Sequence, residues 1–193
     1  IGAPTVLELD GEWAGWRWVW LRSDEARDAE GMAMGNCVGG GYYDNMDEHA
    51  GVFSLRDPRG EPHVTVELDG HDVQQAECRG GAGISDRFRG LVDRMAAVIG
   101  VRLLVNGDPT AEVADGAYSV GSVGSILAGD REVYHVVDSV LHRDGGPARI
   151  DVSAGIYYER GVETRRIAIH HDNWPAYYYS CRMADDLDQL SRS

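Results

Sequence analysis

Residues 52–77 read VFSLRDPRGEPHVTVELDGHDVQQAE, and this stretch decides the fold of the N-terminal part of the chain. Two turn signals, Pro58–Gly60 and Gly70, divide it into three short segments. In the middle segment, valine and leucine alternate with polar residues, which is the period of a strand with one buried face. The stretch therefore predicts an antiparallel meander with strands at about 52–57, 62–69 and 72–77.

Helices are predicted on both sides of the meander. Ser23 is suited to cap a helix over residues 24–34, because Asp24 and Glu25 then lie where the helix dipole favours negative charge. The expected buried side of this helix consists of Ala26, Ala29, Met32, Ala33 and Met34. Apolar residues at helical spacing predict a second helix over 86–99, with Gly100 as its stop and 101–105 (VRLLV) as a buried strand.

A tryptophan-rich segment precedes the first helix. Trp16, Trp18 and Trp20 alternate with other residues at the period of a strand, so the three rings share one face. Such a stripe either packs into the core or forms a contact patch for a partner protein, since tryptophan is enriched in the hot spots of interfaces.

The pattern of apolar residues changes after about residue 106, where helical periodicity almost disappears. Short strand-like segments separated by turns follow, and residues 184–190 (ADDLDQL) read as a short terminal helix. We therefore expect an α+β fold: a helix–β-meander–helix part over 1–105 and a mainly antiparallel β part with a short C-terminal helix over 106–193.

Composition excludes several function classes. Asp and Glu number 32 against 18 Lys and Arg, all of them arginine, and the net charge of −14 disfavours contact with nucleic-acid phosphates. The sequence has no apolar run of about 18 residues, so no membrane contact is expected. The three cysteines are widely spaced, which favours a reducing cytoplasm over a disulfide framework. No metal or cofactor is expected, because no phosphate loop, GxGxxG or HExxH motif occurs.

An ordered set of short motifs begins at Glu30 and ends at Gln75. Its members are Glu30-Gly31, Met34-Gly35-Asn36-Cys37-Val38-Gly39, Tyr42 or Tyr43, Ser54-Leu55-Arg56-Asp57, Gly60, Thr65-Val66-Glu67 and Gln74 or Gln75. This set resembles the PcfJ-like family, whose members are common on conjugative plasmids and in phages and prophages. The family signature has histidine where Asn36 stands, and an asparagine that ECRGGAG (77–83) lacks. The resemblance thus implies a mobile-element protein in which any chemistry of that histidine and asparagine is lost.

A second resemblance lies at residues 141–148 (LHRDGGPA), which are similar to one unit of the His-Arg-x-x-Gly-Pro-Ala β-repeats of phage and bacterial proteins. Asp-Gly-Gly-Pro favours a tight turn between strands, so we interpret this unit as structural.

Cys37 is the candidate nucleophile. It follows a predicted helix among glycines whose N–H groups could form an oxyanion hole, and His49, His63 or His71 could act as its base, with Asp69 or Asp72 as orienter. The alternative is a buried structural cysteine in a close-packed glycine turn.

We expect a cytoplasmic phage or mobile-element accessory protein that binds a host or phage protein, a class that includes inhibitors of host systems. The alternatives are a cysteine-dependent hydrolase or transferase centred on Cys37 and a virion structural component. The candidate catalytic residues are Cys37, His63 and His71, and the candidate binding residues are Trp16, Trp18, Trp20, Tyr42, Arg56, Glu67 and Gln75.

Overall fold

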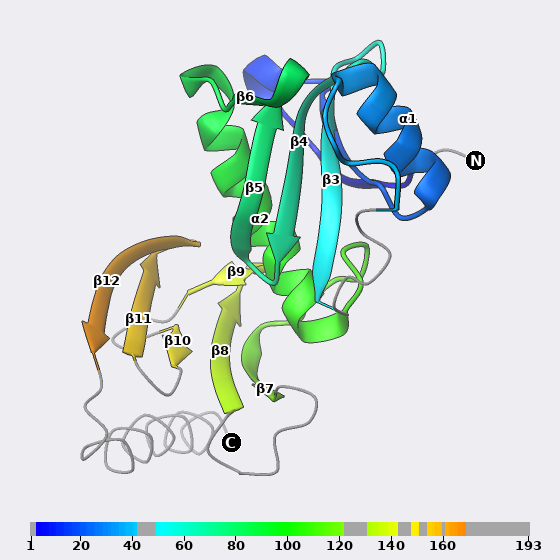
Figure 1. Cartoon of the computed structure of the whole chain (residues 1–193). Helices are drawn as coiled ribbons and strands as arrows, with labels where there is room; N and C mark the ends of the chain where they lie inside the picture. The colour runs from blue at the N-terminus through cyan, green and yellow to red at the C-terminus, as the bar shows by residue number, and fades with distance from the viewer. Residues whose placement is uncertain are drawn as a thin grey trace. The chain divides into compact units, whose positions relative to one another are not determined.

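The chain forms two units, Ile1–Val113 and Ala114–Ser193, in a computed structural model that describes residues 3–41, 49–121, 131–142, 148–150, 154–159 and 161–168 (Figure 1). The boundary falls after Val113, further along the chain than the expected position near 106. The reason is that the segment after the second helix stays attached to the first unit. Arg102 Nη1 donates to the carbonyl of Pro109 at 3.2 Å, and Val113 is buried.

The first unit is an antiparallel six-stranded sheet with two α-helices. The strands follow each other in space as they do in sequence: β1 (Thr5–Glu8), β2 (Arg17–Trp20), β3 (Ala50–Arg56), β4 (Pro62–Asp69), β5 (Asp72–Cys78) and β6 (Ala82–Gly83). The helices are α1 (Asp24–Met34) and α2 (Asp86–Asn106), and the short 3-10 turns are η1 (Gly11–Trp13) and η2 (Arg79–Gly81). The predicted α+β class and the meander β3–β4–β5 are confirmed.

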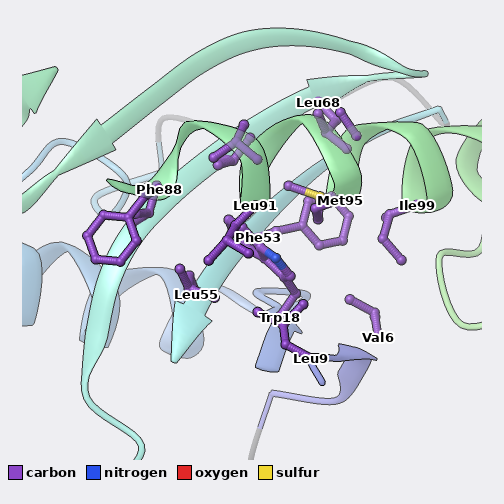
Figure 2. Close-up of a cluster of buried hydrophobic side chains, with 14 of the residues drawn as sticks. Val6, Leu9, Trp18, Phe53, Leu55, Leu68, Phe88, Leu91, Met95 and Ile99 are labelled. Carbon is purple, nitrogen blue, oxygen red and sulfur yellow. The ribbon is translucent and has the colours of Figure 1, made fainter. Parts of the chain in front are cut away.

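The main core lies between one face of the sheet and α2. Phe53 and Leu55 of β3 and Leu68 of β4 point toward Phe88, Leu91, Met95 and Ile99 of the helix (Figure 2). Val64 and Val66 of β4 belong to the same buried cluster. Successive strand residues point to opposite faces, so the residues between them face the other side, where α1 lies. There Val19, Leu21, Val38 and Val52 form a smaller apolar cluster against Ala26.

The prediction of a strand at 101–105 is wrong, because α2 continues through these residues. Met95, Ile99 and Leu103 are fully buried at helical spacing, and the helix ends at Gly107, whose φ of +64° is left-handed. Gly100 is not a stop. It allows close contact, since a Cβ there would lie 2.3 Å from the Cα of His71.

The predicted helix at 24–34 is confirmed, with Ser23 Oγ accepting from the Ala26 N–H at 3.3 Å. Its buried side differs from the expected one. Glu30 and Met34 are the buried residues of α1, whereas Met32 is 88% exposed. An ion pair of Glu30, described below, decides which side of α1 meets the sheet.

The second unit contains a separate antiparallel sheet. Its strands are β7 (Gly116–Gly121), β8 (Arg131–Val137), β9 (Val140–Leu141), β10 (Arg149–Ile150), β11 (Ala154–Glu159) and β12 (Val162–Ala168). The order is β12-β11-β10-β8-β7, with β9 also paired to β8. β9 and β10 flank the LHRDGGPA unit, whose residues 143–147 lie outside the described residues, as does the predicted terminal helix. In the described parts of the chain, no helix has the length and apolar character needed to cross a bilayer.

Candidate functional site

A buried carboxylate lies at the centre of the polar groups between α1 and the sheet. Glu30 has no exposed surface, and its Oε2 accepts a hydrogen bond from Nη2 of Arg56, on β3. Its Oε1 accepts from Oγ1 of Thr65, on β4, at 2.9 Å. A buried charge is costly unless it is paired and hydrogen-bonded, and both oxygens of Glu30 meet that condition. The pair attaches α1 to the middle strands of the sheet.

Asn36 extends this network beyond the end of the helix. Its Nδ2 donates to Thr65 Oγ1 at 3.2 Å, and its Oδ1 accepts from the Val38 N–H at 3.4 Å. The helix ends one residue earlier at Gly35, which has a left-handed φ of +66°. The Thr65 hydroxyl therefore donates to Glu30 and accepts from Asn36, so one side chain holds both the helix and the loop that follows it.

A small pocket opens beside this network. Its lining consists of Asn36, Val38, Val52, Thr65, Glu67, Gln75 and Glu77. Glu67 and Gln75 are register partners on β4 and β5, and Gln75 Nε2 donates to Glu77 Oε1 at 2.6 Å. The pocket volume is about 10 Å³, which is room for about one water molecule. The hydrogen bonds of Glu30 and Asn36 to Thr65 hold α1 and the loop after it on the sheet beside this pocket.

The predicted binding residues of the motif set thus lie together on one face of the sheet. Arg56 contacts the buried Glu30, and Glu67 and Gln75 line the pocket next to Thr65. Tyr42 lies outside the described residues. Sequence reasoning missed the central role of Glu30, although its place in the ordered motif set was a usable signal.

Cys37 is exposed, in contrast to the alternative of a buried structural cysteine. Its loop is attached to α1, because the Gly40 N–H donates to Asp28 Oδ1 at 2.7 Å. One N–H group of the predicted oxyanion hole is therefore already bonded to a carboxylate of the protein. Within the described residues, no hydrogen bond or ion pair joins Cys37 to a histidine.

Of the three candidate bases, His49 has its Nδ1 3.1 Å from the carbonyl oxygen of Leu103, and the other two lie near opposite ends of β4. His63 is at its start, with Nε2 3.3 Å from Asp57 Oδ2, and His71 follows its end, with Nε2 3.5 Å from Asp72 Oδ1. His63 and Asp69 are six residues apart on β4, which is about 20 Å at about 3.3 Å per residue, and His71 lies in the turn just beyond Asp69. His63 and His71 cannot both adjoin Cys37. Across the described part of the chain, no group of three or more His, Cys, Asp or Glu residues is placed to hold a metal ion.

Asp57 organises the turn between β3 and β4. Partial burial raises the pKa of its carboxyl, but the backbone N–H of Glu61, the ring of His63 and the N–H of Arg59 together lower that pKa below its usual value of 3.8. Both N–H groups donate to Oδ1 at 2.9 Å. The turn is therefore stabilised by the ionised form of Asp57.

An aromatic pocket lies where the tryptophan-rich segment meets the start of α2. Trp13 and Trp16 are half-buried and stand edge to face, with centroids 5.0 Å apart and planes at 87°. The ring of Trp16 lies 4.7 Å from His63, and both tryptophans lie within about 6 Å of Phe88. The two tryptophans, together with Glu12 and Arg87, line a pocket of about 360 Å³.

A cation–π contact and an ion pair connect the tryptophan-rich segment at this pocket to α2. The guanidinium of Arg87 lies over the rings of Trp13 and Trp16, at 5.1 and 5.7 Å from their centroids. Arg94 Nη1 of α2 donates to Asp10 Oδ1 at 3.0 Å, and this hydrogen bond and charge lower the pKa of the Asp10 carboxyl. Asp10 in turn accepts the N–H of Trp13 through its carbonyl at 3.1 Å. The segment carrying the tryptophans is thus attached to α2.

The other two predicted tryptophans have different surroundings. Trp18 is fully buried in the main core, so its ring cannot reach a partner. Trp20 is half-buried and carries the guanidinium of Arg22 at 5.4 Å. Sequence reasoning missed Trp13 as a pocket residue. Trp13 lies in the turn η1 and not in a strand, so the alternation that links Trp16, Trp18 and Trp20 does not include it. Sequence reasoning also missed Arg87, which lies on a helix about 70 residues further along the chain.

Comparisons with models of protein families, with curated proteins and with solved structures gave no match.

Proposed function

We propose that this chain is a protein-binding accessory protein of a phage or other mobile element, and that the Trp13–Trp16 pocket is its contact site. The observation that carries the proposal is the pocket itself: two half-buried tryptophans and an arginine around about 360 Å³ of open space. Tryptophan and arginine are the side chains most enriched in interface hot spots, where they fill or line pockets near the centre of the contact.

The geometry favours binding energetically. Phe88 and His63 pack against the tryptophan rings, and the guanidinium of Arg87 lies 5.1 Å from the centroid of Trp13. A partner therefore meets side chains that are already ordered, so little rotamer entropy is lost on association. Preorganised aromatic groups are the kind of anchor that yields affinity in this way.

Charge indicates the kind of partner. The chain carries a net charge of −14, and Glu12 at the rim of the pocket is exposed. These charges favour a basic protein surface over a nucleic acid. The resemblance to the PcfJ-like family supports a plasmid or phage context, in which the partner is a host or phage protein in the bacterial cytoplasm.

Affinity capture from a bacterial lysate, followed by titration of the purified partner, tests the proposal. Trp16→Ala is expected to weaken binding by about 30-fold, the equivalent of a hot spot of about 2 kcal/mol. Met32→Ala is the matched control, since Met32 is an exposed hydrophobic residue on α1. Equal binding by both variants would show that the pocket is not the contact site.

A cysteine-dependent hydrolase or transferase is the second candidate, favoured by the exposure of Cys37 on a glycine-rich loop. An activated cysteine reacts faster with iodoacetamide at neutral pH than an ordinary exposed thiol, because the thiolate is the nucleophile. A Cys37 labelling rate equal to that of free cysteine counts against this candidate, and a rate many times higher would favour it.

A further inference from the structure

The outer side of β5 is only partly covered. β6 pairs with its last two residues, Gly83 opposite Glu77 and Ala82 opposite Cys78. Among the described residues, no strand lies beside Val73–Ala76 on that side. Alternate residues of this stretch therefore present outward N–H and C=O groups, which is the template that an added strand needs.

An apolar groove runs beside this open edge. Its lining consists of Val73, Ala76, Ile84, Arg89, Val92 and Asp93, around about 360 Å³. Val73 is 41% exposed, one of few large hydrophobic side chains of the described residues to be so open. Strand β5 forms one wall and α2 the other, so side chains from an added strand would enter the groove between them.

β6 shows how a strand attaches here. It runs antiparallel to β5, and the glycines around it, Gly80, Gly81 and Gly83, face open space. An incoming segment can continue the line of β6 along Val73–Ala76, a length of about 14 Å at about 3.4 Å per residue. The edge thus already pairs with a strand of the chain itself, and the vacant part carries a bulge at Gln74, where the pairing with β4 shifts from Leu68–Val73 to Glu67–Gln75.

The two faces of the edge differ in chemistry. Ala76 and Cys78 point to the apolar side that packs on α2, whereas Gln75 and Glu77 point to the polar pocket side together with Glu67. At the rim of the groove Asp93 is exposed, while Arg89 is 3.7 Å from Asp86. An added strand with apolar residues on one face and Lys or Arg on the other would match both faces, since successive strand residues alternate.

We propose that the open edge of β5 is a docking site for an extended, alternately apolar and basic segment of a partner protein, which adds to the sheet as an antiparallel strand. Backbone hydrogen bonds to Val73–Ala76 supply affinity, and apolar side chains in the β5–α2 groove supply specificity. This site is separate from the Trp13–Trp16 pocket and does not rest on it.

The full-length chain and a defined probe test this proposal. The probe is an acetylated and amidated hexapeptide, Lys-Val-Lys-Val-Lys-Val, titrated while the amide signals of the protein are followed by NMR. Signals of Val73–Ala76 are expected to shift, and the amides there to exchange more slowly. Lys-Gly-Lys-Gly-Lys-Gly carries the same charge without the apolar face, and is expected to bind at least about tenfold more weakly.

Val73→Asp places a charge in the groove and is expected to weaken binding of the valine peptide at least about tenfold. Val137→Asp, a change at a similarly exposed valine of the second unit, is expected to leave it unchanged. Alternate N-methylation of the peptide removes its hydrogen bonds on one side, and one of the two methylation patterns is expected to abolish binding. The N-methylated peptides need no protein variant, so they test the proposed strand pairing even if Val73→Asp fails to fold.

Three outcomes would overturn the proposal. Equal binding of the valine and glycine peptides would reduce the contact to charge alone. Shifts confined to residues outside β5 and its groove would place the peptide elsewhere. Concentration-dependent dimerisation that is lost in Val73→Asp would mean that a second copy of the chain occupies this edge. Loss of partner capture in Trp16→Ala has no bearing on this result, so the two proposals fail separately.

Discussion

Replacing Arg56 by methionine is expected to destabilise the first unit by about 3 kcal/mol, because it leaves the carboxylate of Glu30 buried without its counter-ion. Loss of one partner of a buried pair costs about 3–5 kcal/mol. Glu30 has no exposed surface, but 19% of the Arg56 side chain is exposed, so water reaches the pair from one side. We therefore expect the lower end of that range.

A double substitution gives a sharper value. In Glu30→Met with Arg56→Met no charge stays buried, and the remaining loss is the hydrogen bond that Thr65 Oγ1 donates to Glu30. That loss costs about 1–2 kcal/mol. The double variant is therefore expected to be more stable than Arg56→Met alone by about 1 kcal/mol or more, which is strong non-additivity.

Urea unfolding followed by tryptophan fluorescence measures these values. Four of the five tryptophans, buried Trp18 among them, belong to the first unit and Trp174 belongs to the second, so all variants are made in a Trp174→Phe background, in which the emission reports on the first unit. Arg59→Met is the control, because Arg59 is exposed in the adjacent turn and its loss is expected to change stability by less than about 0.5 kcal/mol. Equal effects of Arg56→Met and Arg59→Met would refute a buried ion pair that holds α1, as would single-variant losses that simply add in the double variant.

Three further predictions concern the glycines of α2, acid stability and thiol reactivity. Gly100→Ala is expected to destabilise the first unit by about 2 kcal/mol, because the added Cβ would overlap the backbone of His71. Gly90 faces open space, so Gly90→Ala is expected to stabilise the unit by up to about 1 kcal/mol. Urea unfolding of the two variants measures both changes in stability. The folded pKa of Asp57 lies below its unfolded value of 3.8, so its contribution to stability is complete above that pH and is lost as the pH falls through the folded pKa. Asp57→Asn is therefore expected to flatten stability against pH in that acidic window, and an unchanged acid profile would contradict this assignment. Dithionitrobenzoate is expected to react with Cys37 before Cys78, since Cys37 is exposed and Cys78 is half-buried, and faster labelling of Cys78 would contradict the loop geometry.

The meander and both helices could be predicted from the sequence because their signals are local. Alternation along β4 and the Ser23 cap each involve residues within a few positions of one another. The end of α2 could not be predicted in the same way. VRLLV is a short apolar run that suits a buried strand and a buried helix equally, and Gly100 has the usual form of a helix stop. Only its contact with His71 shows why glycine stands there.

The candidate site depended on contacts that sequence spacing does not show. Glu30 is 26 residues from Arg56 and 35 from Thr65, and only the pairing of β3 with β4 brings these partners under α1. A glutamate in a polar helix is usually exposed, so alanine and methionine were the expected buried residues. The ordered motif set did contain all four members of this network, Glu30, Asn36, Arg56 and Thr65.

The pocket residues of the tryptophan-rich segment also depended on contacts that sequence spacing does not show. Strand periodicity places Trp16, Trp18 and Trp20 on one face, and all three pack on the main core. The open pocket instead pairs Trp16 with Trp13, which arrives through the turn η1, and with Arg87 from α2. Both are tertiary contacts, and neither follows from the period of a strand.

The most direct test of the proposed function compares Trp16→Ala with Cys37→Ser in one assay, the affinity for the captured partner protein measured by isothermal titration calorimetry. A binding protein that acts through the aromatic pocket is expected to lose about 30-fold in affinity with Trp16→Ala and to bind unchanged with Cys37→Ser. The reverse pattern, with affinity or turnover of the partner lost only in Cys37→Ser, would contradict the proposal and make Cys37 the functional centre.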